Sequence, residues 1–147
     1  KAPLSEGFAV FREFLQIKPD LHVAGQVRNG TTKGIDENAL AAYNAPFPDD
    51  DHKQGVRQFP NLVPGTPRTP SAEPNKEAWK ILREWKKPFL CAFSDKDPIF
   101  SGVENSFYKL IPGCKDMPHV TIQNAGHFLQ EDQPNACVEA ILSIKDI

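Results

Sequence analysis

The stretch "NAGHFLQEDQP" (Asn124–Pro134) decides how the second half of this chain of 147 residues is interpreted. It follows the segment "HVTIQ" (119–123), which we predict to be a β-strand, so His127 comes just after a strand ends. An earlier stretch, "SDKDP" (Ser94–Pro98), follows the apolar run "KPFLCAFS" in the same way and contains Asp97. A carboxylic acid and a histidine therefore each follow a predicted strand.

The order of elements in this half predicts a parallel sheet. The run from Phe89 to Phe93 is continuously apolar, which is typical of a strand that is buried on both faces. The sequence predicts a helix over 103–111 between the strands and a last helix that begins at Asp132 or Pro134. Because ligands bind at the carboxyl ends of strands in open parallel sheets, we expect the acid and the histidine to share one edge. Two strands are too few for a stable parallel sheet, so we expect the fold to be incomplete.

The first half is predicted to be a cluster of short helices. Ser5 can cap a helix that carries Phe8 and Phe11 on one face, and Asp36 can cap another. The remaining predictions are a loop at 29–34, a short helix between Asp49 or Asp50 and Pro60, an extended crossing over 63–74 and a helix over 76–85. These helices are too short to bury much apolar surface alone, so we expect them to form a cap over the edge of the sheet.

The composition argues against some classes of partner. Apolar residues make up 39% and charged residues 24% of the chain, and the formal net charge is −2. This balance argues against nucleic acid or an anionic membrane surface as a partner. No apolar stretch approaches the ~20 residues that a membrane span needs, and no secretory signal is visible in the sequence, which starts at Lys1.

The cysteines and the absence of ligand-binding patterns lead to further expectations. Cys91, Cys114 and Cys137 have neither a paired nor a metal-like spacing, which favours reduced thiols and a cytoplasmic location. The sequence contains no metal-binding pattern and no phosphate-binding loop, so we expect neither a metal nor a cofactor.

A histidine next to a carboxylate is the pairing that general base catalysis needs. A carboxylate on one ring nitrogen fixes the tautomer and stabilises the imidazolium, and the other nitrogen can then accept a proton. We assign these roles to Asp97 and His127, because Pro98 turns the chain and leaves the Asp97 carboxylate at the edge. Asp95 is expected to project to the opposite side. The alternative is a turn-forming aspartate and a surface histidine, but the spacing and the two small residues before the histidine favour the catalytic pair.

The same stretches resemble a known family. "GHFLQEDQP" resembles the histidine loop of the α/β-hydrolases, a G-H-aromatic-x-x-E-x-x-P pattern, and "SDKDP" resembles their acid loop, which usually has a glycine where Ser94 stands. In the first half, "EGFAVF", "LAAYNAPFPDD" and "GVRQFPNLVP" resemble cap and pocket segments of the haloalkane dehalogenases whose triad acid follows the penultimate strand. The resemblance covers nearly the whole chain, but only the C-terminal half of a family member.

The resemblance implies an α/β fold that is a partial α/β-hydrolase fold, with a helical cap followed by the last two parallel strands and their helices. Residues 1–74 are then the helical cap region and linker, and residues 75–147 are the C-terminal part of the α/β-hydrolase core, whose sheet is incomplete. No G-x-[SD]-x-G elbow occurs in the sequence, so the nucleophile is expected in the missing N-terminal half. The isolated chain is expected to be inactive.

The implied activity is the hydrolysis of carbon–halogen bonds by a catalytic triad. An aspartate nucleophile displaces the halide and forms an alkyl-enzyme ester, and His127, held by Asp97, activates the water that hydrolyses the ester. Resemblance also implies the pocket wall for a small apolar halogenated substrate: Phe8, Phe11, Pro60 and Val63. The alternative for the two phenylalanines is that they form the core of the cap.

One position departs from the family pattern and keeps other functions open. The best-known members of the subgroup have a tryptophan at the position of Phe11, and its indole N–H holds the halide, whereas phenylalanine has no donor. Halide binding is therefore weaker, or the donor lies upstream, or the substrate is not a haloalkane. An epoxide hydrolase is one alternative, although only Tyr43 and Tyr108 are available as phenols. A serine esterase and a non-catalytic hydrolase-fold binding protein are the others.

Overall fold

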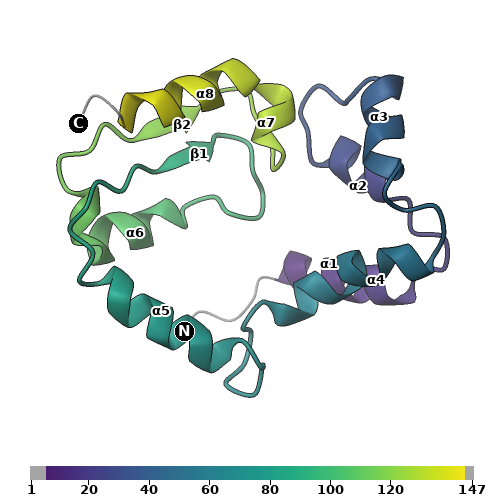
Figure 1. Ribbon diagram of the computed structural model, residues 1–147, viewed down its shortest axis with the longest axis horizontal. Helices are drawn as coiled ribbons and strands as arrows, with labels where there is room; N and C mark the ends of the chain where they lie inside the picture. The colour runs from purple at the N-terminus through teal and green to yellow at the C-terminus, as the bar shows by residue number, and fades with distance from the viewer. Residues whose placement is uncertain (1–5, 145–147) are drawn as a thin grey trace. The chain divides into compact units, whose positions relative to one another are not determined.

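The computed structural model describes residues 6–144, which divide into two compact units (Figure 1). One unit contains the described residues up to Gln26 together with Asp36–Trp79. The other contains Val27–Ile35 together with the described residues from Lys80 onward. The segment 27–35 thus belongs with the C-terminal half of the chain. The division into a cap region at residues 1–74 and a core at residues 75–147 stays a prediction. Ser5, the predicted N-cap residue of the first helix, lies outside the described residues.

The first unit is built from short helices. α1 (Glu6–Ile17) buries Leu15 and contacts α4. Asp36 caps α3 as predicted, because its side chain accepts a hydrogen bond from the N–H of Ala39 at 2.8 Å. The other elements are α2 (Val23–Asn29), α3 (Glu37–Asn44), η1 (Asp51–Lys53), α4 (Gln54–Gln58), η2 (Phe59–Leu62) and α5 (Ala72–Leu82). The residues of α2 and α5 are divided between the two units.

Two boundaries in this region differ from the predictions. α5 begins at Ala72, inside the segment that was expected to be extended, and it ends at Leu82 rather than Trp85. Pro74 is tolerated because it lies in the first turn, where a backbone N–H has no partner within the helix. The α-helical segment ends at Gln58, two residues before the predicted stop at Pro60, which lies inside the 3₁₀-helix η2.

The second unit contains a two-stranded parallel sheet. β1 (Ala92–Ser94) and β2 (Val120–Ile122) pair in parallel, as predicted, with Phe93 opposite Thr121. The backbone hydrogen bonds continue just beyond the strands, since the N–H of Asp95 donates to the carbonyl of the last residue of β2 at 3.1 Å. The two strands therefore end side by side at their carboxyl ends.

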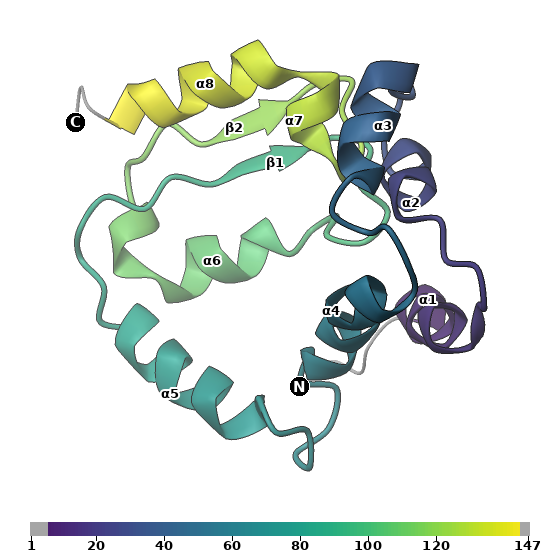
Figure 2. The same cartoon turned by 45° about the vertical axis from the view of Figure 1, so that its right-hand side comes forward.

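Helices lie on both sides of this sheet. α6 (Glu104–Leu110) connects the strands, and its Phe107 ring contacts the rings of Phe89 and Phe93, with centroids 5.9 and 6.1 Å apart. α8 contacts β2, and Figures 1 and 2 both show α8 beside β2 and α6 beside β1. The other elements of the unit are η3 (Pro112–Cys114), α7 (Leu129–Asp132) and α8 (Pro134–Ser143).

The strands are shorter and more exposed than the sequence predicts. Of the apolar run 89–93, only the last two residues belong to β1, and the residues of β1 are half-buried instead of buried on both faces. Within residues 6–144 each strand has a single neighbour, so one edge of each strand lacks a partner. Short strands with unpaired edges are what we expect of a parallel sheet that lacks its other strands.

Candidate active site

The loop that carries His127 is tied to the end of β1. Directly after β2, Asn124 has a φ of 59°, in the left-handed region that asparagine tolerates better than most residues, and the chain reverses there. The N–H of Ala125 then donates to Oδ1 of Asp95 at 3.0 Å. In return, the N–H of Lys96 donates to the carbonyl of Ala125 at 3.0 Å. The loops that follow the two strands are thus connected just before the histidine.

Asp97 is held in an orientation that presents one oxygen to His127. Its Oδ1 accepts a hydrogen bond from the N–H of Ile99 at 2.7 Å, across Pro98, which is the side-chain turn that aspartate commonly forms. Its Oδ2 lies 3.1 Å from Nδ1 of His127. Asp97 is only 7% exposed, so the contact is shielded from water. The structure brings together the two residues that the sequence singled out.

Aromatic rings border the imidazole of His127. The ring of Phe100 lies 5.5 Å from it and the ring of Phe128 lies edge-on at 5.1 Å, both measured between centroids. The side chain of His127 remains 28% exposed. Its Nε2 has no hydrogen-bond partner among the described residues. With a proton on Nδ1 facing Asp97, Nε2 carries the lone pair and can act as a base.

Asp95, the other acid of the first loop, has a different role. It contacts the N–H of Ala125 and not the imidazole. Hydrogen bonding from the backbone of Ala125 holds the pKa of Asp95 below its ordinary value. Its carboxylate instead connects the loop after β1 to the histidine loop.

Cys91 is not arranged as a nucleophile. It is 2% exposed, and burial, together with the neighbouring Cys114, raises the pKa of its thiol to about 12. The thiol therefore stays protonated at neutral pH. No serine or cysteine of the described residues shares a hydrogen bond with His127.

The four predicted pocket residues all lie in the first unit. Phe8 and Phe11 are half-buried on α1, Pro60 is half-buried in η2, and Val63, directly after η2, is 37% exposed. Their role in binding stays a prediction.

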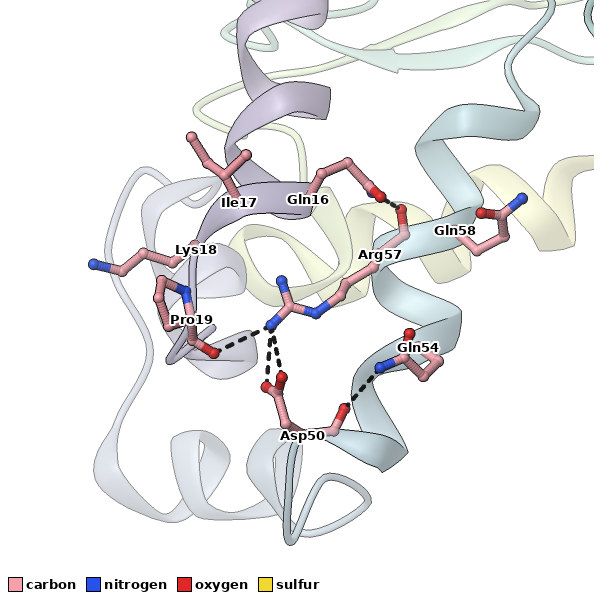
Figure 3. A pocket seen from close by; sticks show the side chains of 8 residues that line it. All are labelled: Gln16, Ile17, Lys18, Pro19, Asp50, Gln54, Arg57 and Gln58. Carbon is pink, nitrogen blue, oxygen red and sulfur yellow. Dashed lines mark hydrogen bonds and ion pairs between the residues drawn. The ribbon is translucent and has the colours of Figure 1, made fainter.

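A cavity of about 610 Å³ in this unit has other walls (Figure 3). Arg57 crosses it and donates to the carbonyl of Leu15 at 2.5 Å, to that of Pro19 at 3.2 Å and to the carboxylate of Asp50 at 3.0 and 3.1 Å. The guanidinium thus provides hydrogen-bond donors for carbonyls at the end of α1. The polar contacts in this cavity therefore stabilise the packing of α1 against α4. None of the four predicted pocket residues lines it.

One buried charge in the second unit is not predictable from the sequence. Asp132 is 2% exposed, and its carboxylate accepts hydrogen bonds from the backbone N–H of Thr32, Lys33 and Gly126. The sequence suggested only a helix start at this position. Its partners are main-chain groups, two of them about 100 residues away, and such groups leave no mark in the sequence.

The described residues contain neither a cluster of metal ligands nor a helix that could span a membrane. Residues 6–144 contain no group of three histidine, cysteine, aspartate or glutamate side chains placed to hold a metal ion. In the same part of the chain, every helix is too short or too polar to cross a membrane.

Two known proteins that the chain resembles carry the same name. No protein-family model matches the chain. The chain is 49% identical over 130 residues to a haloalkane dehalogenase of Psychrobacter cryohalolentis, a match that covers 88% of the chain and 43% of the relative. It is 40% identical over 136 residues to a haloalkane dehalogenase of Mycolicibacterium paratuberculosis, covering 92% of the chain and 45% of the relative. The chain spans less than half the length of these curated relatives.

A solved structure agrees with the sequence relatives. The haloalkane dehalogenase DpaA from Paraglaciecola agarilytica NO2, described as a tetramer, superposes with a TM-score of 0.82 and 27% identity. The match covers 97% of this chain and 46% of that chain. The fold, two parallel strands with an acid and a histidine at their ends, is therefore a partial α/β-hydrolase fold. Within this class, the chain is homologous to part of the haloalkane dehalogenases.

Proposed function

We propose that the chain is part of a haloalkane dehalogenase-like hydrolase in which His127 is the general base and Asp97 orients it. The observation that carries the proposal is the 3.1 Å contact between Nδ1 of His127 and Oδ2 of Asp97 at the ends of two neighbouring parallel strands. The relatives support the choice of reaction, and the partial coverage supports a missing N-terminal half that holds the nucleophile.

The proposed chemistry divides into two steps. An aspartate of the missing half attacks the carbon that bears the halogen, so that a carbon–oxygen bond forms and the halide leaves with the electron pair. In the second step Nε2 of His127 takes a proton from water, and the hydroxide adds to the carbonyl carbon of the ester. The tetrahedral intermediate then expels the alcohol, which takes the proton from the imidazolium, and the aspartic acid that remains releases its own proton to water, which regenerates the carboxylate. Asp97 stabilises the imidazolium that exists during this step.

The proposed substrate is a small apolar halogenated molecule. Phe8, Phe11, Pro60 and Val63 have the apolar side chains that such a pocket wall needs, and all four lie in the first unit. A departing halide is stable in a dry pocket only where N–H groups bind it, and Phe11 has no donor. We therefore assign the halide donors to the missing half. The three free thiols support a cytoplasmic location for the longer protein.

The test begins with the coding sequence upstream of Lys1. The protein that this longer reading frame encodes, called the longer protein below, is expected to carry an aspartate at a strand-to-helix elbow. Purified, it is expected to release halide from a 1-haloalkane and to form the matching alcohol in equal amount. A serine at the elbow with ester hydrolysis instead would make it an esterase. Hydrolysis of epoxides without halide release would make it an epoxide hydrolase, and a residue that is neither aspartate nor serine would indicate a binding protein.

A further inference from the structure

Asp132 is a buried carboxylate that the proposed chemistry does not use. Oδ1 accepts hydrogen bonds from the N–H of Thr32 at 3.0 Å and of Lys33 at 3.1 Å. Oδ2 accepts from the N–H of Thr32 at 2.9 Å and of Gly126 at 2.8 Å. The side chain of Lys33 also donates to the backbone carbonyl of Asp132 at 2.6 Å. A single side chain thus joins the segment 32–33 to the residue before His127.

These hydrogen bonds stabilise the ionised form of Asp132. Burial alone would raise the pKa of the carboxyl, but the hydrogen bonds from the backbone of Gly126 and Thr32 outweigh burial and hold its pKa below the ordinary value. The carboxylate is therefore ionised at neutral pH, and as an anion it accepts from all its donors at once. A neutral side chain of the same shape cannot do this, because an amide presents only one acceptor oxygen.

The backbone on both sides of His127 depends on this arrangement. Before the histidine, the N–H of Gly126 is held by Asp132. After it, the N–H of Phe128 donates to the carbonyl of Gly30 at 3.2 Å, two residues before the segment 32–33 that Asp132 holds. Gly126 also approaches the Gly30 carbonyl so closely that a side chain there would collide with it. These contacts hold the backbone on either side of the residue that carries the imidazole.

We propose that Asp132 is a positioning residue for His127: its carboxylate holds the histidine loop so that Nδ1 stays on Asp97 and Nε2 faces the reacting water. This inference rests on the proposed function, because it assigns Asp132 to the step in which His127 acts. His127 has no part in halide displacement. Loss of the Asp132 contacts therefore slows hydrolysis of the ester and leaves ester formation unchanged.

The experiment compares three variants of the longer protein. Asp132→Asn removes an acceptor and the charge, Asp132→Glu keeps the charge but displaces the carboxylate, and Glu139→Gln on α8 is the matched control at an exposed site. The amounts of halide and of trapped ester are measured within a single turnover after mixing with a 1-haloalkane. We expect Asp132→Asn to slow ester hydrolysis on the order of 10–100-fold, because a misplacement of ~1 Å has an effect of this size. Asp132→Glu is expected to show a smaller decrease in the same step.

Asp132→Glu also serves where Asp132→Asn does not fold, because it keeps the ionised group. An equal decrease in both steps in a folded Asp132 variant, or no decrease in either, would overturn the inference. Glu139→Gln must behave as the unchanged protein.

A spectroscopic measurement separates this inference from the proposed function. The ¹⁵N spectrum of labelled histidine reports which ring nitrogen of His127 carries the proton and needs no substrate. We expect one tautomer, protonated on Nδ1, in the unchanged protein and a mixture in folded Asp132 variants. If the longer protein forms no ester with any haloalkane, the proposed function fails, and the spectrum alone decides the role of Asp132. A spectrum that is the same in all folded variants would rule out positioning.

Discussion

The two ring nitrogens of His127 face different surroundings, and this difference defines its chemistry. Nδ1 lies against the Asp97 carboxylate, while Nε2 has no partner within residues 6–144. The acid is itself fixed, because the N–H of Ile99 occupies its other oxygen. An imidazole held in this way needs little reorganisation when it takes a proton.

Replacing His127 by alanine is expected to trap the ester in the longer protein. Halide displacement does not involve the imidazole, so each site releases halide once and then stops. The measurement is the halide burst and the mass of the modified protein. His52→Ala is the control, because His52 is an exposed histidine that contacts Asp49 in the first unit. Several turnovers in the His127 variant would remove it from the role of base.

Asp97→Asn is expected to slow ester hydrolysis by about 10²–10⁴-fold, because an amide permits the wrong imidazole tautomer and does not stabilise the imidazolium. The rate is measured from the decay of the trapped ester. Asp116→Asn is the control, since Asp116 is exposed and has a φ of 61°, which asparagine also adopts readily. A decrease of less than about threefold in Asp97→Asn would contradict the assignment.

These residues differ in how far the sequence reveals them. Asp97 and His127 could be predicted because each follows an apolar run and lies in a recognisable local pattern. The contacts of Asp132 could not, because its partners are backbone N–H groups of a distant segment. Phe100 is a similar case, since nothing in its local sequence indicates that it reaches the imidazole.

At the scale of elements, the close approach of the segment 30–33 to the histidine loop leaves no room at Gly126. A Cβ there would collide with the carbonyl of Gly30, which is part of the backbone and cannot swing aside. We expect Gly126→Ala to lower the free energy of unfolding of the longer protein by about 1–3 kcal/mol.

Gly55→Ala provides the matched control for this change. Gly55 lies in α4 and its Cβ would meet nothing within 4 Å, so alanine is expected to be neutral or to stabilise by up to about 1 kcal/mol. Denaturant midpoints give both values. Equal effects of the two substitutions would show that the segment 30–33 moves away from the loop.

The contact that Asp132 makes between the segment 32–33 and the histidine loop is also expected to depend on pH. The folded state holds the pKa of Asp132 below its ordinary value of 3.8. The folded state therefore binds fewer protons, so the stabilisation is complete above about pH 5 and is lost as pH falls through the lowered folded pKa.

The free energy of unfolding, measured between pH 6 and pH 2.5, is expected to fall less steeply in Asp132→Asn than in the unchanged protein. Glu139→Gln is expected to leave the slope as it is, because Glu139 is exposed. An unchanged slope in Asp132→Asn would mean that this carboxyl titrates alike in both states.

Helices and strands that have a capping residue or a clear position between other elements could be predicted from the sequence. Those that form because of packing against distant residues could not. α3 begins after the capping aspartate that the sequence indicates, and α6, which lies between the two strands, begins and ends within one residue of the predicted range 103–111. α2 carries no such signal and forms with three buried apolar residues, Val23, Ala24 and Val27. The strand at residues 89–93 was overestimated, because a strand extends only where a neighbour accepts its hydrogen bonds.

At the scale of the whole molecule, the exposed apolar surface of the second unit indicates that it lacks a covering. On α8, Val138 is 53%, Ile141 65% and Leu142 47% exposed. A helix that borders a sheet in a complete domain rarely leaves so many large apolar side chains in water.

The isolated chain of 147 residues is therefore expected to bind a hydrophobic dye strongly and to associate in solution. Dye fluorescence and light scattering measure the two effects, with the longer protein as the control. A sharp cooperative melt from a clean monomer would contradict this prediction.

The second unit is discontinuous along the chain, because residues 36–79 belong to the other unit. The bond between Thr32 and Asp132 closes a loop of 100 residues, whereas the strand pair closes a much shorter one. Contacts of such separation form late in folding, since the chain entropy of the long loop must be lost before they can form. During refolding, the parallel strands and α6 should acquire their structure first. The histidine loop then reaches its final geometry only in the last phase, so that in the longer protein recovery of catalysis lags behind recovery of secondary structure.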